Sequence, residues 1–102
     1  MTWTTVRELC DVAPDIPLGV LVEGVPICVV YTCGEIYAVH DECTHAAVPL
    51  SEGEVVDRTI ECWMHGSRFD LRTGAVMNLP ATRPVETYPA RLLGGRVQID
   101  PH

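Results

Sequence analysis

Two short segments of the chain carry residue types that bind metals. The first contains Cys43 and His45, separated by one residue, and the second contains Cys62 and His65, separated by two. Sixteen residues lie between the two segments. Each segment therefore offers one thiolate and one imidazole, and two loops on neighbouring hairpins could bring the four side chains around one centre. Two kinds of centre use such mixed ligands: a tetrahedral zinc ion, and a [2Fe–2S] cluster in which two His replace two Cys on one iron.

The order of the four residues distinguishes these centres only in part. The familiar zinc pattern pairs two Cys on a hairpin with two His on a helix, whereas here each half is a mixed pair and the second half lacks helical periodicity. Mixed pairs suit a two-iron centre if both Cys reach one iron and both His reach the other. The spacing therefore favours the cluster and leaves a structural zinc-binding module as the alternative.

The residues around the second pair extend the pattern. Segment 62–70 reads Cys-Trp-Met-His-Gly-Ser-Arg-Phe-Asp and, with the Cys-Thr-His run at 43–45, closely resembles the Rieske family. More narrowly, nearly the whole chain is similar to the Rieske ferredoxins of bacterial aromatic-ring dioxygenase systems, such as those acting on biphenyl, naphthalene or carbazole. The resemblance implies four ligands for one Rieske-type [2Fe–2S] cluster: Cys43, His45, Cys62 and His65. Two neutral imidazoles in place of two thiolates remove negative charge from the centre, which raises its reduction potential above that of all-Cys ferredoxins.

The same resemblance implies a domain organisation and a role. It predicts a single domain over 1–102, with a basal part at about 1–41 and 84–102, a cluster-binding part at about 42–83, and a proline-bearing loop at 78–84 over the cluster. The chain would be a one-electron carrier without substrate chemistry of its own, moving electrons from an NAD(P)H-dependent ferredoxin reductase to a terminal oxygenase. A carrier for another Rieske-dependent oxygenase and a nitrite-reductase-like small subunit are the alternatives; the latter commonly lack the ligands.

Some positions depart from other members of the family. Rieske proteins of respiratory complexes tie the two loops with a disulfide, but the corresponding residues here are Val48 and Met64, and Phe69 replaces a Tyr that donates to a ligand sulfur. Ser67 is retained as a possible donor to a cluster sulfur, and Trp63 stands where Pro is usual. Fewer hydrogen bonds to sulfur stabilise the reduced state less, so we expect a potential near about −150 mV rather than about +300 mV.

The elements that must position these loops are short strands. Runs of β-branched and aromatic residues alternate with Gly-containing turns, which predicts an all-β fold of small antiparallel sheets, sandwich-like or partly closed. The expected strands and hairpins lie at 19–23, 27–32, 36–40, 55–61, 67–76, 87–93 and 96–100. Segment 5–12 is expected to form one helical turn at most.

Composition limits the possible partners and location. Seven basic and fourteen acidic residues give a net charge of −7, which opposes binding to nucleic acid or anionic membranes and favours basic protein partners. Without an apolar stretch long enough to span a bilayer and without a leader-like start, a soluble cytoplasmic monomer is expected.

Ordinary structural roles are expected for most other candidate residues. Arg68 should form an ion pair with an acidic neighbour, whereas Trp63 and Met64 could either pack beneath the cluster or line a docking face. The remaining cysteines should be partly buried and inert: Cys10, Cys28 and Cys33.

Overall fold

The computed structural model describes residues 3–101, which form three small antiparallel sheets. Within these residues the sheets have the strand orders β1-β10-β9, β2-β3-β4-β8 and β5-β6-β7. The strands are β1 (Thr4–Glu8), β2 (Leu18–Val22), β3 (Val25–Thr32), β4 (Glu35–His40), β5 (Glu54–Val56), β6 (Thr59–Glu61), β7 (Arg68–Asp70), β8 (Thr87–Tyr88), β9 (Ala90–Leu93) and β10 (Arg96–Ile99). Two short 3₁₀ turns, η1 (Leu9–Asp11) and η2 (Leu50–Glu52), complete the regular structure. The all-β prediction is therefore confirmed.

Strand β3 is the centre of the molecule. Side chains of a strand point alternately to its two faces, and here both faces are buried. Ile27 and Val29 join a core shared with the first sheet, whereas Cys28 and Val30 join a core that also contains the predicted ligands Cys43 and Cys62. The sheet β2-β3-β4-β8 thus lies between two hydrophobic cores.

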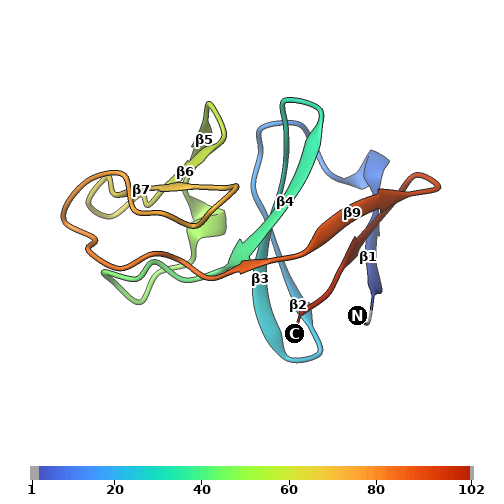
Figure 1. The fold of residues 1–102 in the computed structure, drawn as a ribbon, viewed down its shortest axis with the longest axis horizontal. Coiled ribbons are helices and arrows are strands. Elements are labelled where there is room, and N and C mark those ends of the chain that lie inside the picture. Colours follow the sequence, from blue (N-terminus) through green and yellow to red (C-terminus); the bar gives the residue numbers. More distant parts are fainter. Residues whose placement is uncertain (1–2, 102) are drawn as a thin grey trace.

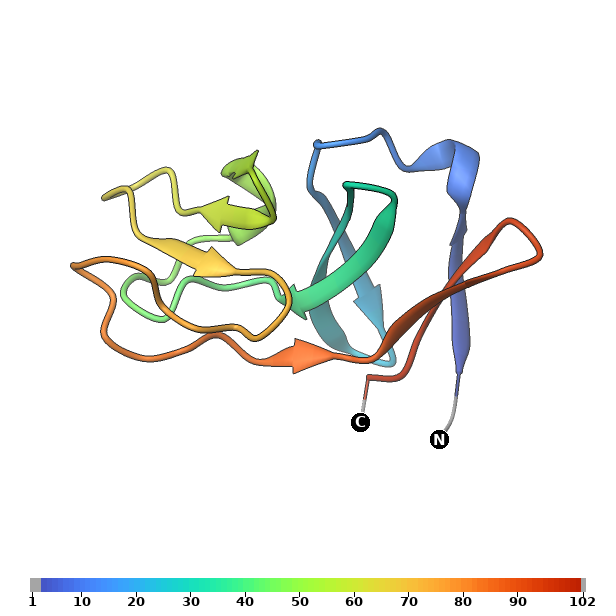
Figure 2. The same cartoon turned by 45° about the horizontal axis from the view of Figure 1, so that its top comes forward.

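The third sheet lies at one end of an elongated molecule that measures 39 × 25 × 19 Å. Figures 1 and 2 show β5, β6 and β7 on one side of the central sheet, with β1 and β9 on the other. The segments that carry the predicted ligands and the segment 78–84 converge at the end formed by β5–β7. No helix among residues 3–101 is long and apolar enough to cross a bilayer.

The N-terminal segment agrees with the expectation of one helical turn at most over 5–12, and it also contains a strand that was not expected. Only Leu9–Asp11 forms such a turn, and Thr4–Glu8 forms strand β1, paired with β10. The physical reason is long-range pairing with a strand from the other end of the chain, in which Val6 packs into the core with the buried Val97 and Ile99. A local sequence pattern does not reveal such a partner.

Two expected elements near the C-terminal half also differ. The segment 87–93 is divided at Pro89, so that β8 pairs with β4 and β9 pairs with β10. Proline has no N–H for a sheet, and it marks the point where the chain passes from one sheet to the other. The hairpin expected at 67–76 is reduced to strand β7 and one antiparallel bridge between Phe69 and Val76.

Candidate metal centre

The first metal-binding segment is a loop that leaves the end of β4. The Cys43 N–H donates to the Val48 carbonyl at 3.0 Å, which closes the loop. At its base, the Asp41 carboxylate accepts hydrogen bonds from the N–H and the hydroxyl of Ser51, each at 2.7 Å. These bonds tie the entry of the loop to the 3₁₀ turn η2 that follows it.

The second metal-binding segment is the tight connection between β6 and β7. The Cys62 N–H donates to the Ser67 carbonyl at 2.8 Å, and the Gly66 N–H donates to the Cys62 carbonyl at 3.0 Å. Strand pairing of Glu61 with Arg68 lies directly below this connection. The hairpin therefore presents Cys62 and His65 on a closed loop at the end of a sheet.

The four predicted ligands are sorted by type and by depth. Cys43 and Cys62 are 3% and 1% exposed and pack in the same hydrophobic core. His45 and His65 are exposed, with their ring centroids 5.1 Å apart and the rings at 75°. Each loop thus contributes its sulfur to an inner pair and its imidazole to an outer pair.

Burial and backbone N–H groups act on the acidity of the Cys62 thiol in opposite directions. Burial raises the pKa of the Cys62 thiol, and the adjacent Cys43 raises it further, whereas N–H groups of Met64 and His65 lower it. Without a cation the Cys62 thiol therefore holds its proton, and a bound metal would displace that proton. The backbone N–H groups directed at the sulfur are donors that would stabilise its charged form.

This arrangement fits a two-iron cluster better than a single ion. A structural zinc ion requires four donors within about 2.0–2.3 Å of one point. Among residues 3–101, no three Cys, His, Asp or Glu side chains gather as ligands of one ion. A pair of thiols beneath a pair of imidazoles would instead provide two ligands for each of two adjacent irons, as the histidine-containing [2Fe–2S] centres require.

Two residues beside the thiols determine how many hydrogen bonds the sulfurs could receive. Ser67 is 1% exposed, and its hydroxyl oxygen accepts the Ala81 N–H at 2.9 Å, which leaves its own O–H available to donate. Phe69 is fully buried in the core and brings no hydroxyl. Ser67 is therefore a candidate side-chain donor to a cluster sulfur. The low reduction potential expected from the sequence stays a prediction.

The segment 78–84 contacts both metal-binding loops through hydrogen bonds that the sequence did not predict. Asn78 bonds to the backbone of Gly66 and Arg68, and Arg83 exchanges hydrogen bonds with Thr44. The sequence identified this segment by its prolines alone. Side-chain amides and hydroxyls leave no local periodic signal when their partners lie 10 to 39 residues away.

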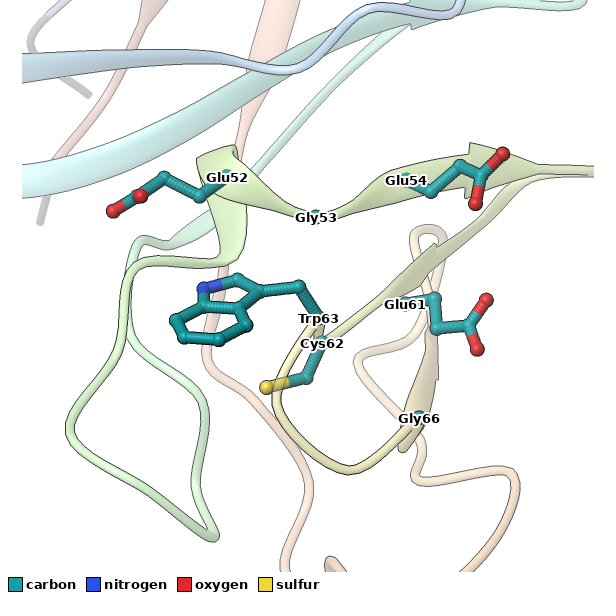
Figure 3. Close-up of a pocket in the computed structure, with 7 residues that line it drawn as sticks. All are labelled: Glu52, Gly53, Glu54, Glu61, Cys62, Trp63 and Gly66. Carbon is teal, nitrogen blue, oxygen red and sulfur yellow. The ribbon is translucent and has the colours of Figure 1, made fainter.

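Trp63 and Met64, whose packing the sequence did not decide, lie on the surface. Trp63 is 53% and Met64 39% exposed, so neither packs beneath the thiols. Arg68 forms the expected ion pair, with its Nε 3.7 Å from a carboxylate oxygen of Glu61. Figure 3 shows Trp63 lying beside the η2–β5 segment, in a pocket that also includes Glu52, Glu54, Glu61 and Cys62.

The other cysteines differ from one another. Cys28 is fully buried, and burial together with the nearby Asp41 raises the pKa of its thiol far above the ordinary value. It therefore stays protonated, in keeping with an inert role. Cys10 and Cys33 are exposed, so the expectation that they would be partly buried was wrong. They lie on surface turns.

Fold and loops together define the class of protein. A family model described as Rieske [2Fe-2S] domain matches residues 2–89, so the chain belongs to the Rieske [2Fe–2S] domain family. This confirms the resemblance predicted from the sequence, and with it a Rieske-type [2Fe–2S] cluster as the cofactor.

Individual relatives narrow the class. The chain is 40% identical over 98 residues to the ferredoxin component of the naphthalene 1,2-dioxygenase system of Pseudomonas aeruginosa, which covers 96% of this chain and 94% of that protein. The solved ferredoxin of carbazole 1,9a-dioxygenase from Nocardioides aromaticivorans superposes with a TM-score of 0.95 at 33% identity, over 100% of both chains. A chain from the complex of reduced oxygenase and oxidized ferredoxin in carbazole 1,9a-dioxygenase has a TM-score of 0.88 at 32% identity, over 95% of this chain and 91% of that one.

Proposed function

We propose that this chain is the ferredoxin of an aromatic-compound dioxygenase system, a one-electron carrier between an NAD(P)H-dependent reductase and a terminal oxygenase. The observation that carries the proposal is the buried pair of thiols beneath an exposed pair of imidazoles, within a Rieske domain. Relatives of nearly the same length are named as ferredoxin components of dioxygenase systems. The protein is thus a component of an oxygenase system and does no substrate chemistry itself.

In this proposal the cluster is held by four residues, Cys43, His45, Cys62 and His65. When bound, the cluster takes up and releases one electron. The protein excludes water from the thiolate side by burying both Cys side chains in the core around Leu50 and Phe69. It leaves the imidazole side exposed, so that His45 and His65 form the shortest route between the centre and a partner.

The same end of the molecule supplies a surface for docking. Three apolar side chains in this part of the molecule are strongly exposed: Trp63 at 53%, Met77 at 56% and Leu79 at 74%. Glu52, Glu54 and Glu61 line the pocket beside Trp63, as Figure 3 shows. An apolar patch with acidic neighbours suits a transient contact with a basic partner surface, since complementary charge speeds encounter without requiring a large interface.

Domain division, location and oligomeric state are parts of the same proposal. We assign residues 42–83 to a cluster-binding part and residues 1–41 and 84–102 to a basal part of one domain. A monomer in the cytoplasm fits a carrier that must meet two partners in turn.

The purified protein provides the first test. Reconstituted or natively loaded protein should be brown, contain two irons and two sulfides per chain, and give a rhombic EPR signal on reduction. It should pass electrons from a ferredoxin reductase to an aromatic-ring oxygenase at a rate that falls with added salt. A colourless protein that binds one zinc would overturn the proposal, and so would a loaded protein that no such oxygenase oxidises.

The ligand set is tested separately by His65→Cys. A third thiolate adds negative charge to the centre, so the reduction potential should fall in any variant that still assembles a cluster. His40→Gln is the matched control, because His40 is hydrogen-bonded to Tyr88 and is not among the proposed ligands. A lowered potential in His40→Gln but not in His65→Cys would refute the assignment.

A further inference from the structure

The two metal-binding loops are closed individually but are not joined by their backbones. The loop at 41–49 is closed by the bond from Cys43 to Val48, and the loop at 62–67 by bonds between Cys62 and its neighbours. Among residues 3–101, no backbone hydrogen bond links one loop to the other. Any protein hydrogen bonds that fix the distance between the loops must therefore involve side chains or a third segment.

One end of that third segment is attached to the second loop by Asn78. Its side-chain carbonyl accepts the Arg68 N–H at 2.7 Å, and its side-chain amide donates to the Gly66 carbonyl at 3.0 Å. The Asn78 side-chain amide thus forms the two hydrogen bonds that a peptide group of a neighbouring strand would form. Between these two anchor points, the Ala81 N–H donates to the Ser67 hydroxyl at 2.9 Å. Three consecutive residues directly after His65 are therefore held by residues 78–81.

The other end of the segment is attached to the first loop by a reciprocal pair. The Thr44 hydroxyl donates to the Arg83 carbonyl at 2.8 Å, and Arg83 Nη2 donates to the Thr44 carbonyl at 3.1 Å. Thr44 lies between Cys43 and His45 in the sequence. A shift of Arg83 relative to Thr44 would therefore move the backbone that carries both proposed ligands of this loop.

We propose that residues 78–83 form a strap that fixes the separation of the two metal-binding loops, with Thr44, Asn78 and Arg83 as its positioning residues. The inference rests on the proposed ligand set. At the positions where respiratory relatives carry a loop-to-loop disulfide, this chain has Val48 and Met64 and no covalent tie. The strap supplies the tie by hydrogen bonds to both loops. It acts on the cluster through the backbone of the two loops that carry the proposed ligands.

The experiment compares the loaded wild type with Thr44→Val, Thr44→Ser and Asn78→Ala. Thr44→Val keeps the shape of the side chain and removes the donor, whereas Thr44→Ser restores it. Thr73→Val is the matched control, because the Thr73 hydroxyl also forms one hydrogen bond, here as the acceptor of the Ala75 N–H, in a turn away from both loops. The readouts are the reduction potential, the EPR line positions of the reduced protein, the rate of cluster loss to a chelator, and hydrogen exchange at the Arg68 amide.

The strap predicts a distinct pattern across these variants. Thr44→Val and Asn78→Ala should shift the potential and the EPR lines and should lose the cluster about fivefold faster, while Thr44→Ser and Thr73→Val behave as wild type. Exchange at Arg68 should be faster in Asn78→Ala with and without the cluster. If Asn78→Ala does not fold, the Thr44 pair and its control decide the question by themselves.

Two results would overturn the strap while leaving the proposed function intact. One is an unchanged potential and EPR spectrum in a folded, loaded Thr44→Val. The other is an equal change in Thr73→Val, which would indicate a general loss of stability. Failure of the proposed function would look different, because the wild type itself would then hold no iron–sulfur cluster.

Discussion

The two ends of this molecule are stabilised in different ways. The end formed by β1, β2, β3, β4, β9 and β10 has strands of four to eight residues and a core of buried apolar side chains such as Ile27, Val29 and Val97. The end that carries the metal-binding loops has strands of three residues, and loops make up most of the rest. Strand pairing repeats the same interaction many times, so loss of one contact in the first end leaves its neighbours in place.

The end with the loops depends instead on single side chains with specific partners. Asp41 holds the base of the first loop, Asn78 holds the second, and Thr44 with Arg83 connects the first loop to the strap. Each of these contacts is made by a side chain and does not belong to a repeating ladder of backbone hydrogen bonds. The first end therefore provides most of the stability of the fold, whereas the second end fixes the positions of the proposed ligands. Substitutions in the two ends should have correspondingly different consequences.

The largest contrast is expected from two cysteine substitutions. Cys62→Ser removes a buried sulfur of the proposed centre and should abolish cluster binding, seen as loss of the visible absorption and of bound iron. Cys33→Ser changes an exposed thiol at a turn of the first end and should leave the iron content unchanged. Equal iron content in the two variants would contradict the proposed ligand set.

A second contrast uses two fully buried isoleucines, Ile27 in β3 and Ile60 in β6. Either Ile→Ala substitution leaves a cavity and should lower the free energy of unfolding by about 2–5 kcal/mol, measured by denaturant titration of the loaded protein. Only Ile60→Ala should also change the EPR spectrum, because Ile60 packs in the core that contains Cys43 and Cys62. A spectral change of the same size in Ile27→Ala would show that the two ends are not independent.

A third contrast concerns two glycines with left-handed backbone angles. Gly74 has φ +78°, and a Cβ there would lie 2.1 Å from the Val85 carbonyl oxygen, whereas a Cβ at Gly94, with φ +59°, would meet open space. Gly94→Ala should therefore lower the free energy of unfolding by about 1 kcal/mol, from backbone strain alone. Gly74→Ala should destabilise by about 2–3 kcal/mol, because steric overlap adds to the strain. Thermal unfolding of both variants measures the difference, and equal values would contradict the close approach.

Local patterns in the sequence were sufficient to predict many of the strands in the end formed by β1–β4, β9 and β10. They were also sufficient to identify the two loops that carry the proposed ligands. The run 27–32 and the run 36–40 are β-branched or aromatic and flank a Gly-containing turn, so they predicted the hairpin of β3 and β4. The spacing of Cys and His likewise identified the two loops that carry the proposed ligands, and this ligand set stays a prediction. A closed loop brings its own two ligands together within a few residues, and that proximity is visible in the sequence.

Contacts between distant residues could not be predicted in this way. Pairing of Thr4 with Ile99 and the contact of Thr44 with Arg83 join residues far apart in the chain, so no short pattern contains both partners. The separation of thiols from imidazoles by depth has the same origin. Cys43 is buried because Leu50 and Phe69 pack around it, and these residues come from other parts of the fold.

The smallest contrast is between one charged pair at each end. Burial alone raises the pKa of Asp70, but hydrogen bonds from the Arg72 side chain and backbone lower it overall, so the pKa in the folded state lies below its ordinary value. The stabilisation is therefore present above about pH 4 and is lost as the pH falls through the folded pKa. Asp70→Asn should lower stability at pH 7 by less than about 1 kcal/mol, and the difference from wild type should disappear in acid.

Glu8→Gln provides the comparison for that pair. Glu8 and Arg96 form an ion pair at 3.6 Å in the first sheet, but both side chains are more than half exposed, at 54% and 61%. Solvent screens such a pair, so its loss should change stability by about 0.3 kcal/mol or less at any pH. Unfolding titrations at several pH values distinguish the two. A pH-dependent loss in Glu8→Gln as large as that in Asp70→Asn would show that charged pairs matter equally at both ends, against the view that single side-chain contacts are decisive only near the metal-binding loops.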